Sequence, residues 1–165
     1  MAEALHLPIN ASKEDIYESL LPQIRSVISG ETNLIANLAN ISSMLKMAFD
    51  HFWVGFYLLE GKSLVLGPFQ GPLACTRIPV YPKPRGVCGT SAYEQKTLLI
   101  EDVEQFSGHI ACSSETRSEI VIPLVIDSHT ELVLDIDSKE LNHFDLIDKK
   151  YCEKIVQLIE ELCFN

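Results

Sequence analysis

The chain has 165 residues, a length at which one domain is expected, and its 47% hydrophobic and 22% charged residues are ordinary for a globular protein. These values exclude disordered, collagenous and low-complexity classes, and the net charge of −10 without a basic run argues against nucleic-acid and membrane partners. No signal-like start and no apolar stretch of about 20 residues occurs, so a cytoplasmic location is expected.

The chain is expected to open with two helices. Ser12 followed by Asp15 resembles an N-terminal capping pair. Apolar residues then recur at helical spacing and predict helices over 13–29 and 32–49, the first interrupted by Pro22.

After residue 50 the pattern changes to aromatic and branched residues, which are typical of strands. Glu60-Gly61-Lys62 is the turn of a predicted hairpin. A loop region rich in Gly and Pro follows, then a second hairpin, and Asp145 is a plausible N-cap for a last helix. The expected elements are strands 52–59 and 63–66, an extended piece at 76–79, a helix at 90–95, a strand at 97–100, strands 119–126 and 131–136, and a helix over 145–163.

This order of helices, antiparallel hairpins and a final helix predicts an α+β fold, in which helices pack on one face of an antiparallel sheet. No repeat or linker divides the chain, so residues 1–165 are expected to form a single domain. Its parts are N-terminal helices over about 13–49, a sheet with active-site loops over about 52–138, and a C-terminal helix over about 145–163. Because loops concentrate in 67–118, that region is expected to carry function.

Five cysteines, an odd number, argue against a disulfide scaffold. Cys75, Cys88 and Cys112 lie in the loop region, which favours reactive thiols, although a free cysteine is commonly a small buried hydrophobe. Cys88 precedes the predicted helix 90–95 and Cys112 follows His109, and a helix N-terminus or an imidazolium lowers a thiol pKa. The two cysteines of the C-terminal helix, Cys152 and Cys163, are expected to serve packing.

A zinc site is the competing interpretation of these thiols. Cys75, Cys88, Cys112 and His109 could supply four ligands, but no Cys-x2–4-Cys pair is present, and structural zinc sites usually contain one.

Carboxylates form the second candidate site. Asp135 and Asp137 are two residues apart in a predicted strand and therefore share a face, and Glu119 begins the partner strand. Neighbouring acids raise each other's pKa and can bind a cation or keep a proton. Trp53 and Tyr57 also share a strand face, so this sheet offers the apolar walls and polar anchors of a pocket. A solvated strand end and core aromatics are the alternatives.

Together these residues resemble the free methionine-(R)-sulfoxide reductases, which are GAF-domain enzymes. The resemblance runs in order from about Asn33 to the C-terminus. The matching segments are Trp53-Val-Gly-Phe-Tyr57-Leu, Leu66-Gly-Pro-Phe-Gln-Gly71, Ala74-Cys75, Arg85-Gly-Val-Cys88-Gly-Thr, Gly108-His-Ile-Ala-Cys112, Ser118-Glu119-Ile-Val and Val133-Leu-Asp-Ile-Asp-Ser138.

The resemblance implies a GAF-like, six-stranded antiparallel sheet flanked by helices, and a homodimer. It implies reduction of free methionine R-sulfoxide through a cysteine sulfenic acid and an intramolecular disulfide. It also implies no metal and no organic cofactor, with reducing equivalents from a thioredoxin-type dithiol. The runner-up function is a GAF sensor that binds a nucleotide or small ligand without chemistry, although an acidic pocket would repel phosphates.

By the same resemblance, Cys112 attacks the sulfur, and Cys88 and Cys75 are the resolving and recycling thiols. The residues implied to bind the substrate are Trp53 and Tyr57, as walls of a methyl pocket, and Glu119, Asp135 and Asp137, as partners of its polar groups.

Three features depart from the family pattern. The segment from Cys75 to Cys88 is about three residues longer, through Tyr81-Pro82-Lys83-Pro84. Ser113 replaces a common Asp, and Leu132 replaces a usual Gly; we expect these changes to affect loop shape and packing more than chemistry.

Overall fold

The computed structural model describes residues 4–108, 110 and 112–164. Its elements are α1 (Lys13–Ile28), α2 (Leu34–Phe49), β1 (Trp53–Glu60), β2 (Ser63–Gln70), β3 (Arg77–Pro79), α3 (Gly86–Glu94), β4 (Leu98–Ile100), a 3-10 turn η1 (Val103–Gln105), β5 (Ser118–Ile126), β6 (His129–Ser138) and α4 (Leu146–Cys163).

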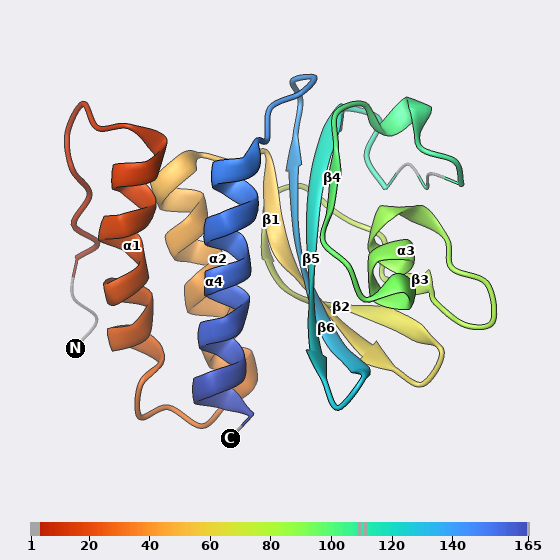
Figure 1. Ribbon diagram of the computed structural model, residues 1–165, viewed down its shortest axis with the longest axis horizontal. Helices are drawn as coiled ribbons and strands as arrows, with labels where there is room; N and C mark the ends of the chain where they lie inside the picture. Colours follow the sequence, from red (N-terminus) through yellow and green to blue (C-terminus); the bar gives the residue numbers. More distant parts are fainter. Residues whose placement is uncertain (1–3, 109, 111, 165) are drawn as a thin grey trace.

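The strands form one antiparallel sheet in the order β3-β2-β1-β6-β5-β4. Figure 1 shows α1, α2 and α4 on one side of this sheet, and α3 with the long loops on the other side. The six-stranded α+β architecture expected from the sequence is confirmed.

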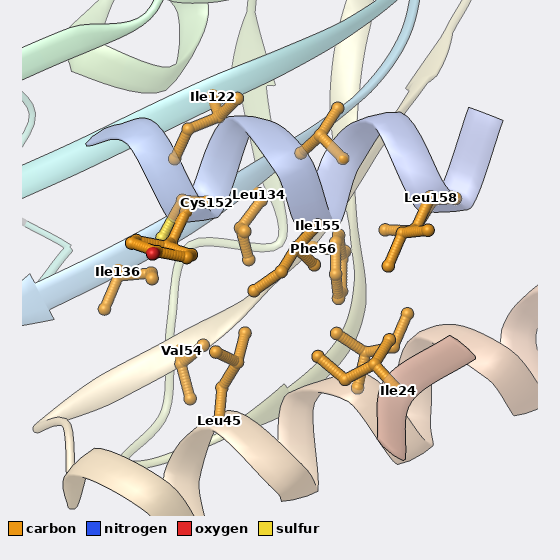
Figure 2. Packing of buried hydrophobic residues seen from close by; sticks show 14 of the residues in the cluster. Ile24, Leu45, Val54, Phe56, Ile122, Leu134, Ile136, Cys152, Ile155 and Leu158 are labelled. Carbon is orange, nitrogen blue, oxygen red and sulfur yellow. The ribbon is translucent and has the colours of Figure 1, made fainter. Parts of the chain in front are cut away.

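The helical side of the sheet carries the larger core. Alternate residues of the strands, such as Val54, Phe56, Leu134 and Ile136, point toward α2 and α4 and are fully buried (Figure 2). Leu132, noted from the sequence as an expected departure, is fully buried in this same core, so its side chain fills the helical layer.

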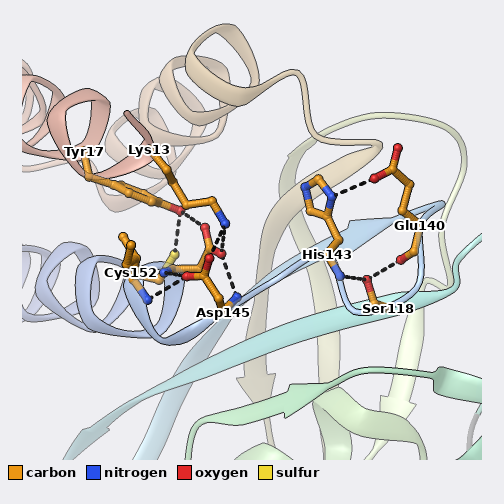
Figure 3. Close-up of polar contacts among 9 residues, drawn as sticks. Lys13, Tyr17, Ser118, Glu140, His143, Asp145 and Cys152 are labelled. Atoms are coloured by element: carbon orange, nitrogen blue, oxygen red, sulfur yellow. Dashed lines mark hydrogen bonds and ion pairs between the residues drawn. The ribbon is translucent and has the colours of Figure 1, made fainter. Parts of the chain in front are cut away.

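A hydrogen-bond network joins the first turns of α1 and α4 (Figure 3). The Asp148 side chain is only 2% exposed and accepts hydrogen bonds from Lys13 Nζ at 2.6 Å, Tyr17 Oη at 2.9 Å and the Asp145 backbone N–H at 2.9 Å. Tyr17 Oη also contacts Cys152 Sγ at 3.7 Å. The network fixes how α1 docks against α4, and Cys152 serves packing as expected.

Several element ends differ from the predicted ones. The Ser12–Asp15 capping box is present, and α1 continues through Pro22. β2 is longer than expected because it continues to pair with β1 as far as Gln70, opposite Val54. β6 is longer because only Asp127 and Ser128, both at positive φ, are needed to turn the chain between β5 and β6. The expected helix 90–95 is wrong in its start, because α3 begins at Gly86. Among the helices of the described residues, none is long and apolar enough to cross a bilayer.

Asp148→Asn should lower the free energy of unfolding by about 1–3 kcal/mol, because an amide leaves one of the three donors to this buried side chain without an acceptor. Asp145→Asn is the matched control, since Asn caps a helix about as well as Asp and the Asp145 side chain is 53% exposed. Urea unfolding at neutral pH measures both; equal losses would contradict the assigned role of Asp148.

Candidate active site

The candidate site begins with the register of three neighbouring strands. Trp53 on β1 lies opposite Asp137 on β6, which lies opposite Glu119 on β5. In the next row of the same face, Gly55 lies opposite Asp135. Strand pairing alone therefore brings three carboxylates and an indole together, on the face turned away from α2 and α4.

Gly55 makes room for the aromatic wall of the site. A Cβ atom there would lie 2.7 Å from the Trp53 ring and 2.4 Å from the Phe69 Cβ. Without it, the Trp53 ring stacks on Phe69 with a centroid distance of 5.3 Å and on Tyr57 at 5.9 Å. The expected shared face of Trp53 and Tyr57 is confirmed, and both side chains are buried.

Helix α3 covers this face and brings Cys88 to the carboxylates. The helix packs closely on β3, because a Cβ at Gly89 would lie 2.6 Å from the Pro79 carbonyl oxygen. Cys88 is buried, and its Sγ lies 3.6 Å from Glu119 Oε1, within reach of a hydrogen bond from the thiol. A helix with two glycines in its first turn was not expected from the sequence; the contact with Pro79 explains Gly89.

Cys75 and Cys112 form a disulfide across 37 residues. The Tyr57 hydroxyl donates a hydrogen bond to the Cys75 carbonyl oxygen at 3.0 Å, so the loop that carries Cys75 is attached to β1. Cys88 remains a free thiol, although it lies in the same site. The structure thus joins two of the three loop cysteines, whereas the sequence left their pairing open.

A narrow cavity of about 40 Å³ connects these parts. Seven of the eight residues proposed from the sequence line it, and Cys75 reaches it through its bond to Cys112. The cavity is also lined by Phe52, Leu73, Ile110 and Thr116, which the sequence did not single out, because isolated loop residues carry no periodicity that would reveal their direction. Ser113, noted only as a departure from the family pattern, lines it as well.

Burial and mutual repulsion control the charges of the carboxylates. Burial, followed by the charges of Asp135 and Asp137, raises the pKa of Glu119 well above its usual range. Burial and then Asp135 likewise raise the pKa of Asp137. Burial also raises the pKa of Asp135, but only to about 6, because hydrogen bonds from Cys88 and Glu119 favour its ionised form. The cluster therefore keeps protons to a higher pH than isolated carboxyl groups do.

The expectation of a low pKa for Cys88 is wrong. Burial, followed by the charges of Asp135 and Glu119, raises the pKa of this thiol. Cys88 is the third residue of α3, and the negative cluster outweighs any benefit from the helix N-terminus. His109, expected to act on Cys112, lies outside the described residues.

Two buried polar atoms in the site have no hydrogen-bond partner among the described residues: Trp53 Nε1 and Asp135 Oδ1. One is a donor and the other an acceptor, and both residues line the cavity. Since buried polar groups are normally hydrogen-bonded, the pair indicates a ligand that carries both an acceptor and a donor.

The possible metal ligands differ from those considered in the sequence. Cys75 and Cys112 share a disulfide, so the set of three cysteines with His109 is not available as thiolates in this state. Within the described residues, Cys88, Glu119 and Asp135 offer atoms within 4.8 Å of one another and could hold a cation, but these atoms also hydrogen-bond each other.

Comparisons with known proteins place the chain among close relatives, although no family model matches it. GAF domain-containing protein A of Dictyostelium discoideum is 55% identical over 161 residues, which cover 97% of this chain and 99% of that protein. The free methionine-R-sulfoxide reductase of Saccharomyces cerevisiae is 40% identical over 171 residues, covering 98% and 93%.

A solved structure agrees. The X-ray structure of free methionine-R-sulfoxide reductase from Neisseria meningitidis in complex with its substrate superposes with a TM-score of 0.91 at 48% identity, covering 96% of this chain and 93% of that one. The GAF fold expected from the sequence is confirmed.

The raised pKa of Glu119 predicts a pH-dependent stability. Between about pH 4, where an unfolded Glu loses its proton, and neutral pH, the folded state binds more protons, so this residue lowers stability as the pH rises. Glu119→Gln has no proton to lose, and its Tm relative to the wild type should increase from pH 4 to pH 8. Calorimetry of the oxidised proteins measures this difference.

Glu94→Gln, at an exposed position of α3, is the control, and its Tm difference should not change with pH. A difference for Glu119→Gln that is constant, or that shrinks as the pH rises, would show that Glu119 is ionised in the folded protein.

Proposed function

Because the chain belongs to the free methionine-R-sulfoxide reductase family, we propose that it reduces the R-sulfoxide of free methionine to methionine in the cavity between α3 and the sheet. One observation carries the proposal: a disulfide that includes Cys112 lies at a cavity lined by three carboxylates. Binding of a nucleotide or small ligand by a sensor would require no disulfide at this place.

The site complements each end of the proposed substrate. The stacked rings of Trp53 and Tyr57 offer an apolar wall for the methyl group and side chain. Asp135 has an unpartnered oxygen, and its hydrogen bonds from Cys88 and Glu119 favour the ionised form, so it is the proposed partner of the substrate ammonium group. A methionine within a peptide lacks that ammonium, which would make the site selective for the free amino acid.

The chemical step needs a thiolate at sulfur and a hydrogen-bond donor at oxygen. In the reduced protein, Cys112 is the proposed nucleophile because it lines the cavity. Burial and neighbouring charges raise the pKa values of Glu119 and Asp137, so these two carboxyl groups are the proposed donors to the sulfoxide oxygen. The sulfoxide oxygen passes to the Cys112 sulfur, which is oxidised to a sulfenic acid. The substrate is thereby reduced by two electrons and is released as methionine.

Cys75 is the proposed resolving thiol, since its sulfur is already bonded to Cys112 in the structure. It condenses with the sulfenic acid, releasing water and forming the disulfide, which an external dithiol then reopens. The resemblance implied a redox role for Cys88, but we propose a structural role for this residue. Its buried thiol lies beside Glu119 and would help hold that carboxyl group in place.

The family likeness also supports four broader proposals: a single GAF domain, a homodimer, a cytoplasmic location, and a reaction driven by a thioredoxin-type dithiol without metal or organic cofactor. Mass measurement of the native protein and of its bound ions tests the assembly and the cofactor proposal directly.

The cysteine roles can be separated in a single turnover. Reduced, desalted Cys75→Ser should release about one methionine per enzyme and stop as a sulfenic acid, because Cys112 is intact but has no resolving partner. Cys112→Ser should release none. The measurements are methionine release and dimedone labelling by mass spectrometry, and Cys163→Ser, in α4, is the control that should resemble the wild type. Methionine release by Cys112→Ser would assign the attack to another thiol.

Selectivity for the free amino acid gives a second test. N-acetyl-methionine sulfoxide lacks the ammonium group, so its kcat/KM should be about 10- to 100-fold lower than that of the free compound, as expected for one lost charged hydrogen bond. In Asp135→Asn this preference should become smaller, because the charge that distinguishes the two substrates is gone. Equal kcat/KM values in the wild type would contradict a free-amino-acid enzyme.

A further inference from the structure

Acidic and basic residues are unevenly distributed along this acidic chain. The 33 residues from Gly61 to Tyr93 contain no Asp or Glu, but they hold four of the 13 Lys and Arg, namely Lys62, Arg77, Lys83 and Arg85. All 23 acidic residues lie outside this segment. The segment includes Cys75, so one half of the disulfide lies in the most basic part of the sequence.

Two of these cations lie next to residues of the disulfide site in the chain. Arg77 is two residues after Cys75, is 61% exposed, and has only a loose pair with the exposed Glu60 at 3.8 Å. Arg85 is exposed and directly precedes Gly86. Gly86 lines the cavity together with Cys112, and its backbone N–H donates a hydrogen bond to the Gly108 carbonyl oxygen at 2.9 Å. Lys83 and Arg85 have no ion-pair partner among the described residues.

An exposed apolar side chain completes this surface. Leu73 is 90% exposed, two residues before Cys75, and lies at the mouth of the cavity beside Cys112. An exposed leucine near basic residues and a disulfide has the composition of a contact surface with an apolar centre and a charged rim.

We propose that the surface formed by Leu73, Arg77 and Arg85 is the docking site of an acidic dithiol protein, which attacks Cys75 Sγ. The proposal rests on the redox role of the disulfide in the proposed function. Both cysteines are half-buried, but Cys112 lines the cavity, whereas Cys75 does not line it and lies between the exposed Leu73 and Arg77 in the chain, so Cys75 Sγ is the proposed point of attack.

The exchange balances in two steps. A thiolate of the partner bonds to Cys75 Sγ, the Cys75–Cys112 bond breaks, and Cys112 leaves as a thiolate with the electron pair. The partner's second thiol, after losing its proton, then attacks the partner's own sulfur in the mixed disulfide. Cys75 leaves as a thiolate and takes up a proton. The partner is oxidised to its disulfide, and Cys112 is ready for the next sulfoxide.

The experiment uses the oxidised full chain without substrate, so its result does not depend on which sulfoxide the enzyme reduces. Reduction by a purified acidic thioredoxin and by dithiothreitol is followed by acid quenching and thiol labelling. The variant Arg77→Glu/Arg85→Glu is compared with Lys149→Glu/Lys154→Glu, which makes the same change in net charge on α4, across the sheet from α3 (Figure 1).

At low ionic strength the Arg77→Glu/Arg85→Glu variant should react with thioredoxin about tenfold more slowly than the wild type, while the α4 variant stays within about twofold. The difference should vanish near 1 M salt, where charges are screened beyond about 3 Å. The dithiothreitol rates should be equal in all three proteins. Leu73→Ser should slow only the thioredoxin reaction, at both salt concentrations.

A thioredoxin variant with a single active-site cysteine should be trapped on Cys75, as shown by peptide mapping. An adduct on Cys112 would overturn the attack on Cys75. Equal slowing in both double variants, or slowing with dithiothreitol as well, would overturn the docking surface.

Discussion

The antiparallel register of β1, β6 and β5 is the constraint on which the candidate site depends. It aligns Trp53, Asp137 and Glu119 in one row and places Asp135 in the next, all on the same face. Because side chains alternate along a strand, a slip of one residue would send these carboxylates into the helical core and bring Leu134 and Ile136 to the cavity. The hydrophobic alternation that stabilises the fold therefore also determines where the acids gather.

The two faces of the sheet make opposite contributions to stability. Toward α2 and α4, fully buried aliphatic and aromatic side chains form a continuous core, and the Asp148 network fixes α1 against α4. Toward α3, three acids lie near one another with raised pKa values, which is unfavourable for folding. The core of the helical layer offsets this cost, so the three acids can remain close together in the candidate site, where the proposed chemistry uses them.

Much of this arrangement could be predicted from the sequence, because it depends on periodicity. The alternation that placed Asp135 with Asp137 and Trp53 with Tyr57 is a local property of each strand. The bond between Cys75 and Cys112 spans 37 residues, and the early start of α3 depends on Gly89 meeting the Pro79 carbonyl across space. Neither contact leaves a periodic signal, and for the same reason the burial that raises the Cys88 pKa was missed.

The disulfide also changes the unfolded chain. Joining Cys75 to Cys112 closes a loop that contains β3, α3 and β4, and in a chain-entropy treatment a loop of this length removes conformational freedom worth about 4 kcal/mol from the denatured ensemble. The oxidised form is therefore the form that resists unfolding. Under the proposed function, in which this disulfide must be reduced before each turnover, a protein that accumulates in the oxidised form when reductant is scarce is protected from unfolding while it is inactive, and it becomes easier to unfold once it can react.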